Sequence, residues 1–377
     1  EVVHAVRNEM ALMLDDVLFR RTGLGTAGSP GDEALSRVAD LMARELGWDE
    51  EERESQINRA TAKFTSWART KAIVNPRSWG GRTGAIWDEL EARLTKAIGP
   101  VEAVFTTAPL DAMRLASQAL KDGMEQIIAV GGDGTINEVV NGFFEHGQPI
   151  NPEAVFACLT SGTGADFRRS FDMPDEVYDQ IERLATSEIR PIDLGRLTFI
   201  DHEGREAVRY FNNIASFGLS GATDRAVNRL KLGKKFSGKT AFFWGMLKAL
   251  VTYRNQPVRI QVDDGFDEVL DVRVAAVCNG RYFGGSMHMA PHAAPDDGLF
   301  DVVIVAGLNT LTLLRRINSI YRGTHLEFDE VTSLRGRKIV ATPAEGASGV
   351  LLDVDGEAPG RLPATFEILP SAIYFRY

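Results

Sequence analysis

The amino-acid sequence predicts an α/β protein in three parts: a small all-helical module, an α/β domain on a parallel sheet, and a β-rich second domain. Three patterns support this prediction. Helical spacing of apolar residues covers 1–68, strands alternate with helices over 69–193, and strand patterns dominate 194–361. The last segment, 362–377, can return to the α/β domain. A chain of 377 residues suits two or three domains.

The helical module is predicted to contain three helices. Apolar residues recur at helical spacing over 5–20. A second helix begins at Asp32 and is stopped by Gly47, and a third begins at Asp49 and runs towards Phe64. Asp is a favoured residue before a helix, and Gly is favoured just after one.

The α/β domain is predicted from short apolar runs that alternate with amphipathic segments. The expected strands are 72–75, 101–106, 125–130 and 155–159, and the expected helices are 83–97, 111–122 and 136–144. Alternation at this spacing indicates a parallel sheet with helices on both faces. Such sheets bind ligands beyond the carboxyl ends of their strands.

The β-rich domain is predicted from eight apolar runs and is interrupted by one helical segment, 222–254. The expected strands are 195–200, 209–216, 258–262, 269–279, 300–305, 338–342, 351–354 and 365–369.

Composition and charge limit the class of protein. The net charge of −10 argues against a nucleic-acid partner, because proteins that bind the phosphate backbone carry a basic excess. We find no apolar run long enough for a transmembrane helix and no signal peptide. Cys158 and Cys278 lie in apolar runs far apart, which predicts two buried thiols in a reducing cytosol. Glu1 begins the chain within helical sequence, and we expect a longer parent protein.

The run Gly131-Gly132-Asp133-Gly134-Thr135 predicts a phosphate-binding loop. It follows an apolar strand and precedes a helix. Its glycines let the backbone approach a phosphate, and the free amides at a helix start favour an anion. The structural alternative is a tight turn between strand and helix. Asp133 would repel a phosphate unless it orients a hydroxyl, an amide or a cation.

Two further polar loops are expected at the same edge of the sheet. One is 75–78 (NPRS) and the other is 160–166, which contains Thr163 and Asp166. Either alone can be an ordinary turn. Three such loops at consecutive strand ends predict a nucleotide site.

Two acidic turns complete the set. Asp297 lies in 295–301 (PDDGLFD), while Asp355 and Glu357 lie in 352–357 (LDVDGE). Acidic residues commonly just form turns. A protein that handles phosphate also needs oxygen ligands for Mg²⁺ and a carboxylate base, and these turns can supply both.

The motifs NPRS, GGDGTINEVVNG, GTGAD, PDDGLFD and VDGE resemble those of the bacterial diacylglycerol-kinase-like lipid kinases, in the same order and at similar spacing. The resemblance covers 71–377. That family shares its GGDGT loop with sphingosine kinases and, more distantly, with NAD kinases and phosphofructokinases. The resemblance implies an enzyme that uses ATP and Mg²⁺ to phosphorylate a lipid hydroxyl, with diacylglycerol favoured as the acceptor and phosphatidic acid as the product.

The resemblance also implies a role for each matching residue. Asp355 would be the general base and Glu357 its supporting acid, with Asp133 in the catalytic set. Asp297 and the carbonyls of Ala294 and Leu299 would hold a structural Mg²⁺. The residues implied in ATP binding are Asn75, Pro76, Arg77, Ser78, Thr106, Thr107, Gly131, Gly132, Asp133, Gly134, Thr135, Asn137, Glu138, Thr163 and Asp166.

The chain departs from the family pattern twice. Ala165 stands where the family usually has Asn, and Trp79 stands where it usually has Gly. We expect altered nucleotide contacts rather than lost activity, because the acids remain.

Residues 1–63 resemble the helical C-terminal cap of flavin-dependent glycerol-3-phosphate dehydrogenases. The segments 4–10 (HAVRNEM) and 15–22 (DDVLFRRT) carry this resemblance. It implies an upstream dehydrogenase domain in a parent chain. The flavin-binding fold is absent, so we expect no oxidation by this segment alone.

A lipid kinase without a transmembrane helix must reach the membrane from the cytoplasm, at its inner face. The basic and aromatic stretch 225–248 suits an anionic interface, although a solvated helix followed by a core segment explains it equally well. Other functions stay open: a sphingoid-base, ceramide or phosphatidylglycerol kinase, an NAD-kinase-like enzyme, or a non-catalytic nucleotide-binding regulator of a fused dehydrogenase. A homodimer also stays open.

Overall fold

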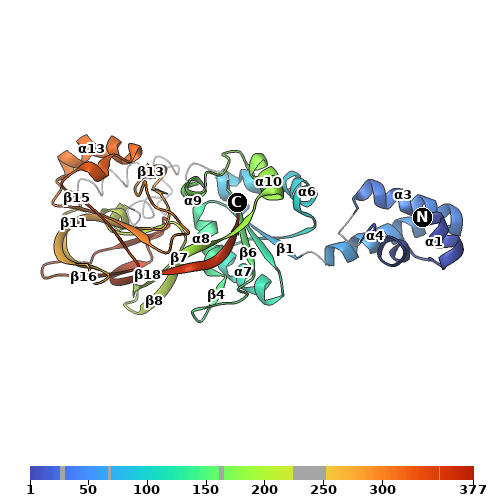
Figure 1. The fold of residues 1–377 in the computed structure, drawn as a ribbon, viewed down its shortest axis with the longest axis horizontal. Coiled ribbons are helices and arrows are strands. Elements are labelled where there is room, and N and C mark those ends of the chain that lie inside the picture. Colours follow the sequence, from blue (N-terminus) through green and yellow to red (C-terminus); the bar gives the residue numbers. More distant parts are fainter. Residues whose placement is uncertain (26–29, 67–68, 161–164, 224–251, 348) are drawn as a thin grey trace.

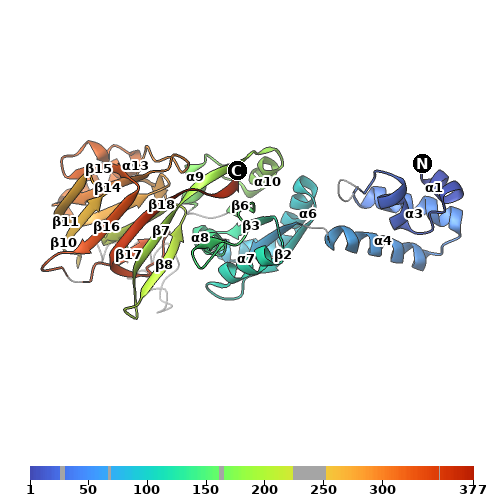
Figure 2. The same ribbon diagram turned by 60° about the horizontal axis from the view of Figure 1, so that its bottom comes forward.

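The computed structural model divides into a helical module, an α/β domain and a β-rich domain, as Figures 1 and 2 show. The structure describes residues 1–25, 30–66, 69–160, 165–223, 252–347 and 349–377. The predicted fold class is confirmed. The helix expected at 222–254 falls almost wholly outside the described residues.

The regular elements of the N-terminal module are all helices in its described part, but the first predicted helix is broken. Met10 adopts a left-handed conformation (φ 55°), so the helix predicted over 5–20 divides after Glu9. Leu14, Leu18 and Met42 lie in the core of the module. Its helices are α1 (Val2–Glu9), α2 (Leu14–Asp16), the π-helix η1 (Val17–Arg21), α3 (Asp32–Leu46) and α4 (Glu50–Ser66).

The α/β domain is built on four parallel strands in the order β6-β3-β1-β2. These strands are β1 (Thr70–Val74), β2 (Val101–Phe105), β3 (Gln126–Gly131) and β6 (Val155–Thr160). Alternate side chains of β1 pack into two different cores. Ile73 packs with α7 (Asp111–Lys121) and α8 (Asp133–Asn141), whereas Ala72 and Val74 pack with α6 (Trp87–Ile98) and α10 (Val177–Thr186). Both faces of the sheet are therefore covered by helices, as predicted.

The helices of this domain depart from the expected boundaries in two places. The helix expected at 83–97 is interrupted at Ile86, and α8 begins at Asp133 rather than at 136. The α-helices are α5 (Arg82–Ala85), α6 (Trp87–Ile98), α7 (Asp111–Lys121), α8 (Asp133–Asn141), α9 (Asp166–Ser170) and α10 (Val177–Thr186). A 3₁₀ turn η2 (Ser78–Gly81) and the hairpin β4 (Phe144–Glu145) and β5 (Gln148–Pro149) complete it.

The β-rich domain contains antiparallel strands around a core that includes Phe211, Phe217 and Phe366. The strand expected at 209–216 is two strands, interrupted at Asn212 and Asn213. The strands are β7 (Ile189–Asp201), β8 (Glu206–Phe211), β9 (Ile214–Gly218), β10 (Gln256–Val262), β11 (Phe266–Cys278), β12 (Tyr282–Phe283), β13 (Met287–His288), β14 (Phe300–Ala306), β15 (Val331–Gly336), β16 (Lys338–Pro343) and β17 (Leu352–Val354).

One helix of this domain, α13 (Thr310–Arg322), was not predicted; a 3₁₀ turn η3 (His325–Glu327) follows it. The final strand, β18 (Gly360–Arg376), joins the two sheet regions. It pairs with β16 and β7 in antiparallel fashion and with β6 in parallel, so Tyr374 lies opposite Val155. Figure 1 shows β7 and β18 running between the two domains. Cys158 and Cys278 are buried and free of any disulfide. Within the described residues, no helix combines the length and apolar character needed to cross a bilayer.

Candidate active site

The first two polar loops meet at the carboxyl edge of the parallel strands. Asn75, just after β1, donates from Nδ2 to Thr135 Oγ1 at 3.0 Å. A side chain on Gly131 would meet Thr135 Oγ1 at 2.6 Å, so the close approach requires glycine there. Ser78 closes the NPRS turn by donating to the Asn75 carbonyl at 2.8 Å. These contacts fix the position of the GGDGT loop relative to the first loop.

Asp355 lies against the helix that follows this loop. Its carboxylate accepts from Asn137 Nδ2 (2.8 Å) and the amides of Asn212 (3.0 Å), Asn213 (3.2 Å) and Ile214 (2.9 Å). The three amides are available because the β strand is interrupted at Asn212 and Asn213. Burial raises the pKa of Asp355, and the donors oppose that rise. Four donors fill the usual capacity of a carboxylate, so a substrate hydroxyl must replace one of them.

Arg209, which the sequence did not single out, joins the acidic turn to α8. It donates to Asn137 Oδ1 through Nε (3.1 Å) and Nη2 (2.9 Å), and to Glu357 Oε2 at 2.6 Å. A side chain on Gly134 would lie 3.7 Å from Glu357 Oε1. The glycine-rich loop and the distant acids are therefore brought together, as the sequence led us to expect.

Asp133 and Asp166 add two more carboxylates to this region. The amide of Asp166 lies 3.4 Å from Asp133 Oδ2, whereas Asp133 Oδ1 is buried and has no hydrogen-bond partner among the described residues. Burial, followed by the charge of Asp166, raises the pKa of Asp133 to about 6. Asp166 accepts from the amides of Gly285 and Ser286, both at 2.8 Å. This turn between β12 and β13 brings the β-rich domain to the site.

An unpaired buried carboxylate oxygen fits a divalent cation. Mg²⁺ is commonly held by one or two carboxylates together with substrate phosphates and waters. Asp133 Oδ1 can supply such a ligand, and a cation there would offset the burial and the repulsion from Asp166 that together raise the pKa of Asp133.

The second predicted Mg²⁺ site does not fit a metal in this arrangement. Arg335 forms an ion pair with Asp297 Oδ2, and Asp297 Oδ1 accepts from the Leu299 amide at 3.0 Å. The positive charge at this turn is thus a guanidinium. The described residues contain no group of three or more His, Cys, Asp or Glu side chains arranged for a metal, so a cation at Asp133 would also need ligands from phosphates or waters.

Two residues implied in ATP binding, Glu138 and Thr107, have hydrogen-bond partners within the protein. Glu138 accepts from the amides of Leu110 (3.0 Å) and Ala112 (3.1 Å), so its carboxylate caps the start of α7. Thr107 donates to Asp111 through both its amide and its hydroxyl. Pro76, Arg77 and Thr106 lie at the ends of β1 and β2, whereas Thr163 falls outside the described residues.

The two departures from the family pattern both have left-handed backbones. Ala165, directly before α9, has φ 51°, and Trp79 has φ 54°. This backbone conformation is higher in free energy for a residue with a Cβ atom than for glycine. Arg82 stacks on the Trp79 ring at 4.0 Å, so the first loop carries a cation at its rim.

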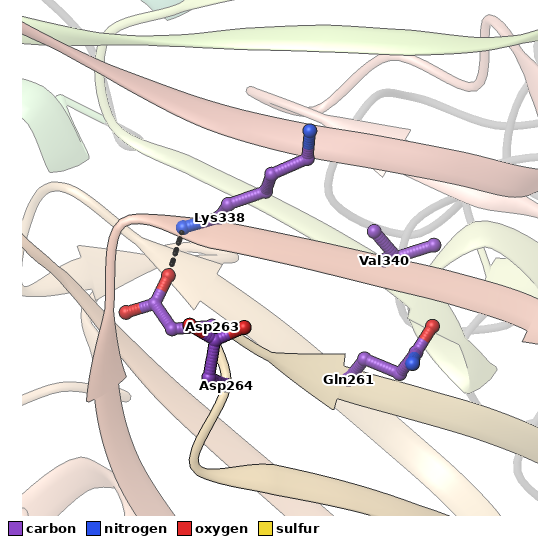
Figure 3. Close-up of a pocket in the computed structure, with 5 residues that line it drawn as sticks. All are labelled: Gln261, Asp263, Asp264, Lys338 and Val340. Carbon is purple, nitrogen blue, oxygen red and sulfur yellow. Dashed lines mark hydrogen bonds between the residues drawn. The ribbon is translucent and has the colours of Figure 1, made fainter.

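A pocket of about 470 Å³ lies away from these residues, between β10 and β16 (Figure 3). Its acid Asp263 is satisfied by backbone amides, including that of Lys338 at 2.8 Å. The pocket lacks the glycine-rich loop and gathers none of the predicted site residues. We therefore place the candidate site at Asp133, Asn137 and Asp355.

Three protein families match successive parts of the chain. The family "Diacylglycerol kinase catalytic domain" matches 69–197, "YegS C-terminal NAD kinase beta sandwich-like domain" matches 213–375, and "C-terminal domain of alpha-glycerophosphate oxidase" matches 1–53. Residues contributing to the site thus come from both of the first two matches.

Individual relatives cover most of the chain. A diacylglycerol kinase of Mycobacterium tuberculosis is 27% identical over 308 residues, which is 81% of this chain and 94% of the relative. One from Staphylococcus carnosus is 28% identical, over 79% of this chain and 91% of the relative. The crystal structure of a putative diacylglycerol kinase from Bacillus anthracis has the same fold, with a TM-score of 0.64 at 21% identity over 82% of this chain and 95% of that chain.

Proposed function

We propose that this chain, which is similar to bacterial diacylglycerol kinases, transfers the γ-phosphate of ATP to the hydroxyl of diacylglycerol. The observation that carries this proposal is the 2.8 Å contact between Asn137, in the helix after the glycine-rich loop, and Asp355. It unites a phosphate-binding element with a buried carboxylate from 218 residues further along the chain.

In the proposed reaction, the lipid hydroxyl oxygen forms a bond to the γ-phosphorus. The bond from that phosphorus to the β,γ-bridging oxygen breaks, and ADP leaves with the electron pair. The hydroxyl proton passes to the Asp355 carboxylate. Burial raises the pKa of Asp355, which makes it a stronger base than an exposed Asp.

The remaining residues position the reactants. Amides of the GGDGT loop at the start of α8 would bind the phosphates, since a helix start attracts anions. Arg209 holds Asn137 and Glu357, and through Asn137 it holds Asp355 in place. Mg²⁺ bound at Asp133 would neutralise phosphate charge. Phosphoryl transfer depends mainly on such positioning and charge stabilisation.

The identity of the molecule that accepts the phosphate distinguishes this proposal from its alternatives. The test is a phosphorylation assay with labelled ATP and a panel of acceptors in mixed micelles: diacylglycerol, ceramide, a sphingoid base, phosphatidylglycerol and, without micelles, NAD. Preferred labelling of diacylglycerol is expected. Preferred labelling of another acceptor would reassign the substrate, and ATP binding without any transfer would favour a regulatory role.

A further inference from the structure

Helix α13 lies on the surface of the β-rich domain with no buried side chain. Asn309 caps its start by accepting from the Thr312 amide at 2.9 Å, and Gly323 ends it with φ 72°. Leu311, Leu314 and Tyr321 are 57%, 43% and 47% exposed. Their spacing of three and seven residues places them on one face of the helix. This apolar face is therefore presented to the surroundings.

The charge of α13 is opposite to that of the whole protein. The net charge of the chain is −10. The thirteen residues of α13 contain no Asp or Glu and three arginines, which are Arg315, Arg316 and Arg322. Arg316 pairs with Glu330 at 2.6 Å. Arg315 and Arg322 are exposed and form no ion pair with any residue that the structure describes. Two exposed acids, Glu327 and Asp329, lie within seven residues of the end of the helix.

An exposed apolar stripe bordered by exposed arginines suits the surface of an anionic bilayer. Leucine and tyrosine side chains enter the headgroup region, and arginines attract the lipid phosphates. We propose that the face of α13 formed by Leu311, Leu314, Arg315, Tyr321 and Arg322 docks the protein on an anionic membrane. This inference rests on the proposed function, because it supplies the surface from which the lipid substrate is taken.

The helix is connected to the candidate site through one hairpin. α13 packs against β13, and a side chain on Gly323 would lie 3.0 Å from His288 Nδ1. The turn that precedes β13 donates from Gly285 and Ser286 to Asp166. Figure 1 shows α13, β13 and α9 along the same side of the molecule. A bilayer under α13 would thus lie beside the hairpin that contacts the site through Asp166.

Binding to vesicles tests the proposal without relying on activity. Co-sedimentation compares vesicles of phosphatidylcholine alone with vesicles containing about 30% phosphatidylglycerol, an anionic lipid. The intact chain is expected to bind the anionic vesicles. The double variant Leu311→Gln/Leu314→Gln is expected to bind them about tenfold more weakly, because two apolar anchors are lost. Arg315→Glu/Arg322→Glu is expected to weaken the same binding at least as much.

Matched controls separate this surface from general effects. Leu12→Gln/Val269→Gln removes two apolar side chains that are 58% and 59% exposed, on different bodies of the molecule. Arg44→Glu/Lys96→Glu makes the same change in charge at exposed positions on α3 and α6. Both controls are expected to bind like the original chain. Equal binding by the α13 variants and the controls would overturn the proposal, and so would failure of the original chain to bind.

A second measurement separates this proposal from the proposed function. The α13 variants are expected to phosphorylate a short-chain, monomeric diacylglycerol normally and to lose activity on vesicles. No phosphorylation of either form by the original chain would contradict the proposed function, while the vesicle-binding result would still decide the role of α13. A dimer that dissociates in Leu311→Gln/Leu314→Gln would show that a second copy covers this face, and would overturn the lipid assignment.

Discussion

At the scale of single residues, the negative charge of Asp133 lowers the stability of the folded protein, because it is buried and lies near Asp166. Its pKa is raised to about 6 in the folded protein, from about 3.9 for an unperturbed Asp. Since the folded state binds the proton more tightly, this group destabilises the protein above pH 6, and the penalty disappears as the pH falls below about 4.

Asp133→Asn should therefore stabilise the ligand-free protein at pH 8. We expect a gain of about 1–3 kcal/mol at that pH, shrinking towards zero at low pH. Thermal unfolding of the variant and of the original chain between about pH 3.5 and pH 8, a range that includes both pKa values, measures it. The control is Asp122→Asn, at an exposed position at the end of α7. A variant less stable than the original at pH 8 would contradict this account.

Arg209 positions Asp355 indirectly, by holding Asn137, which donates to the Asp355 carboxylate. Its charge lowers the pKa of Asp355, against the larger effect of burial. Arg209→Gln should reduce kcat about tenfold to a hundredfold, because a small misplacement of reacting groups is costly. It should also shift the acidic limb of the pH profile to higher pH, since the pKa of Asp355 rises. Arg196→Gln, which loses a 3.5 Å pair with Glu367, should do neither. An unshifted profile would limit Arg209 to a structural role.

At the scale of elements, two neighbouring glycines of the glycine-rich loop have different roles, since Gly131 is required by packing and Gly132 leaves space for a ligand. A side chain on Gly131 would meet Thr135 at 2.6–3.0 Å, whereas one on Gly132 would meet nothing within 4 Å. Gly131→Ala should therefore destabilise the fold by about 1–3 kcal/mol, because Thr135 must shift away from Asn75. Gly132→Ala should leave stability unchanged and raise the KM for ATP, because its methyl group would obstruct the phosphates. Equal thermal stability of the two variants would disprove the distinction.

The sequence predicted the elements whose signals are local. The parallel strands and their polar loops follow from apolar runs and glycine-rich turns, and their convergence follows from the geometry of parallel sheets. The interruption at Asn212 and Asn213 was missed, although two Asn residues inside a strand pattern are a signal against a continuous strand. Helix α13 was also missed, although Asn309 and Gly323 mark its two ends.

Other features could not be predicted from local patterns. Arg209 and Glu357 are 148 residues apart, and nothing near Arg209 distinguishes it from other arginines of the strands. The partner of Asp297 is equally remote, since Arg335 comes from β15. Glu138 matches the family motif, yet its orientation depends on how α7 packs beside α8. In each case tertiary packing, rather than sequence spacing, determines the contact.

At the scale of the whole molecule, β18 unites the two larger domains. Phe375 is completely buried and its ring contacts those of Phe156, Phe167, Phe171 and Tyr377. Phe375→Ala should destabilise the protein by about 3–5 kcal/mol, because it leaves a large cavity where the sheet regions join. Urea unfolding measures this change. The neighbouring Tyr374 is 36% exposed, and Tyr374→Ala should cost much less. Equal losses would contradict the role given to this packing.

The central claim is that the glycine-rich loop and the acid from the far end of the chain form one phosphoryl-transfer site. The direct test compares Asp355→Asn with Asp263→Asn. Asp263 is a matched control, because it too has a left-handed backbone (φ 46° against 49°) and accepts backbone amides. Labelled ATP and diacylglycerol in mixed micelles report the rate of transfer. We expect Asp355→Asn to lose about a thousandfold in kcat while remaining folded, and Asp263→Asn to retain full activity. Full activity in a folded Asp355→Asn protein would contradict the claim.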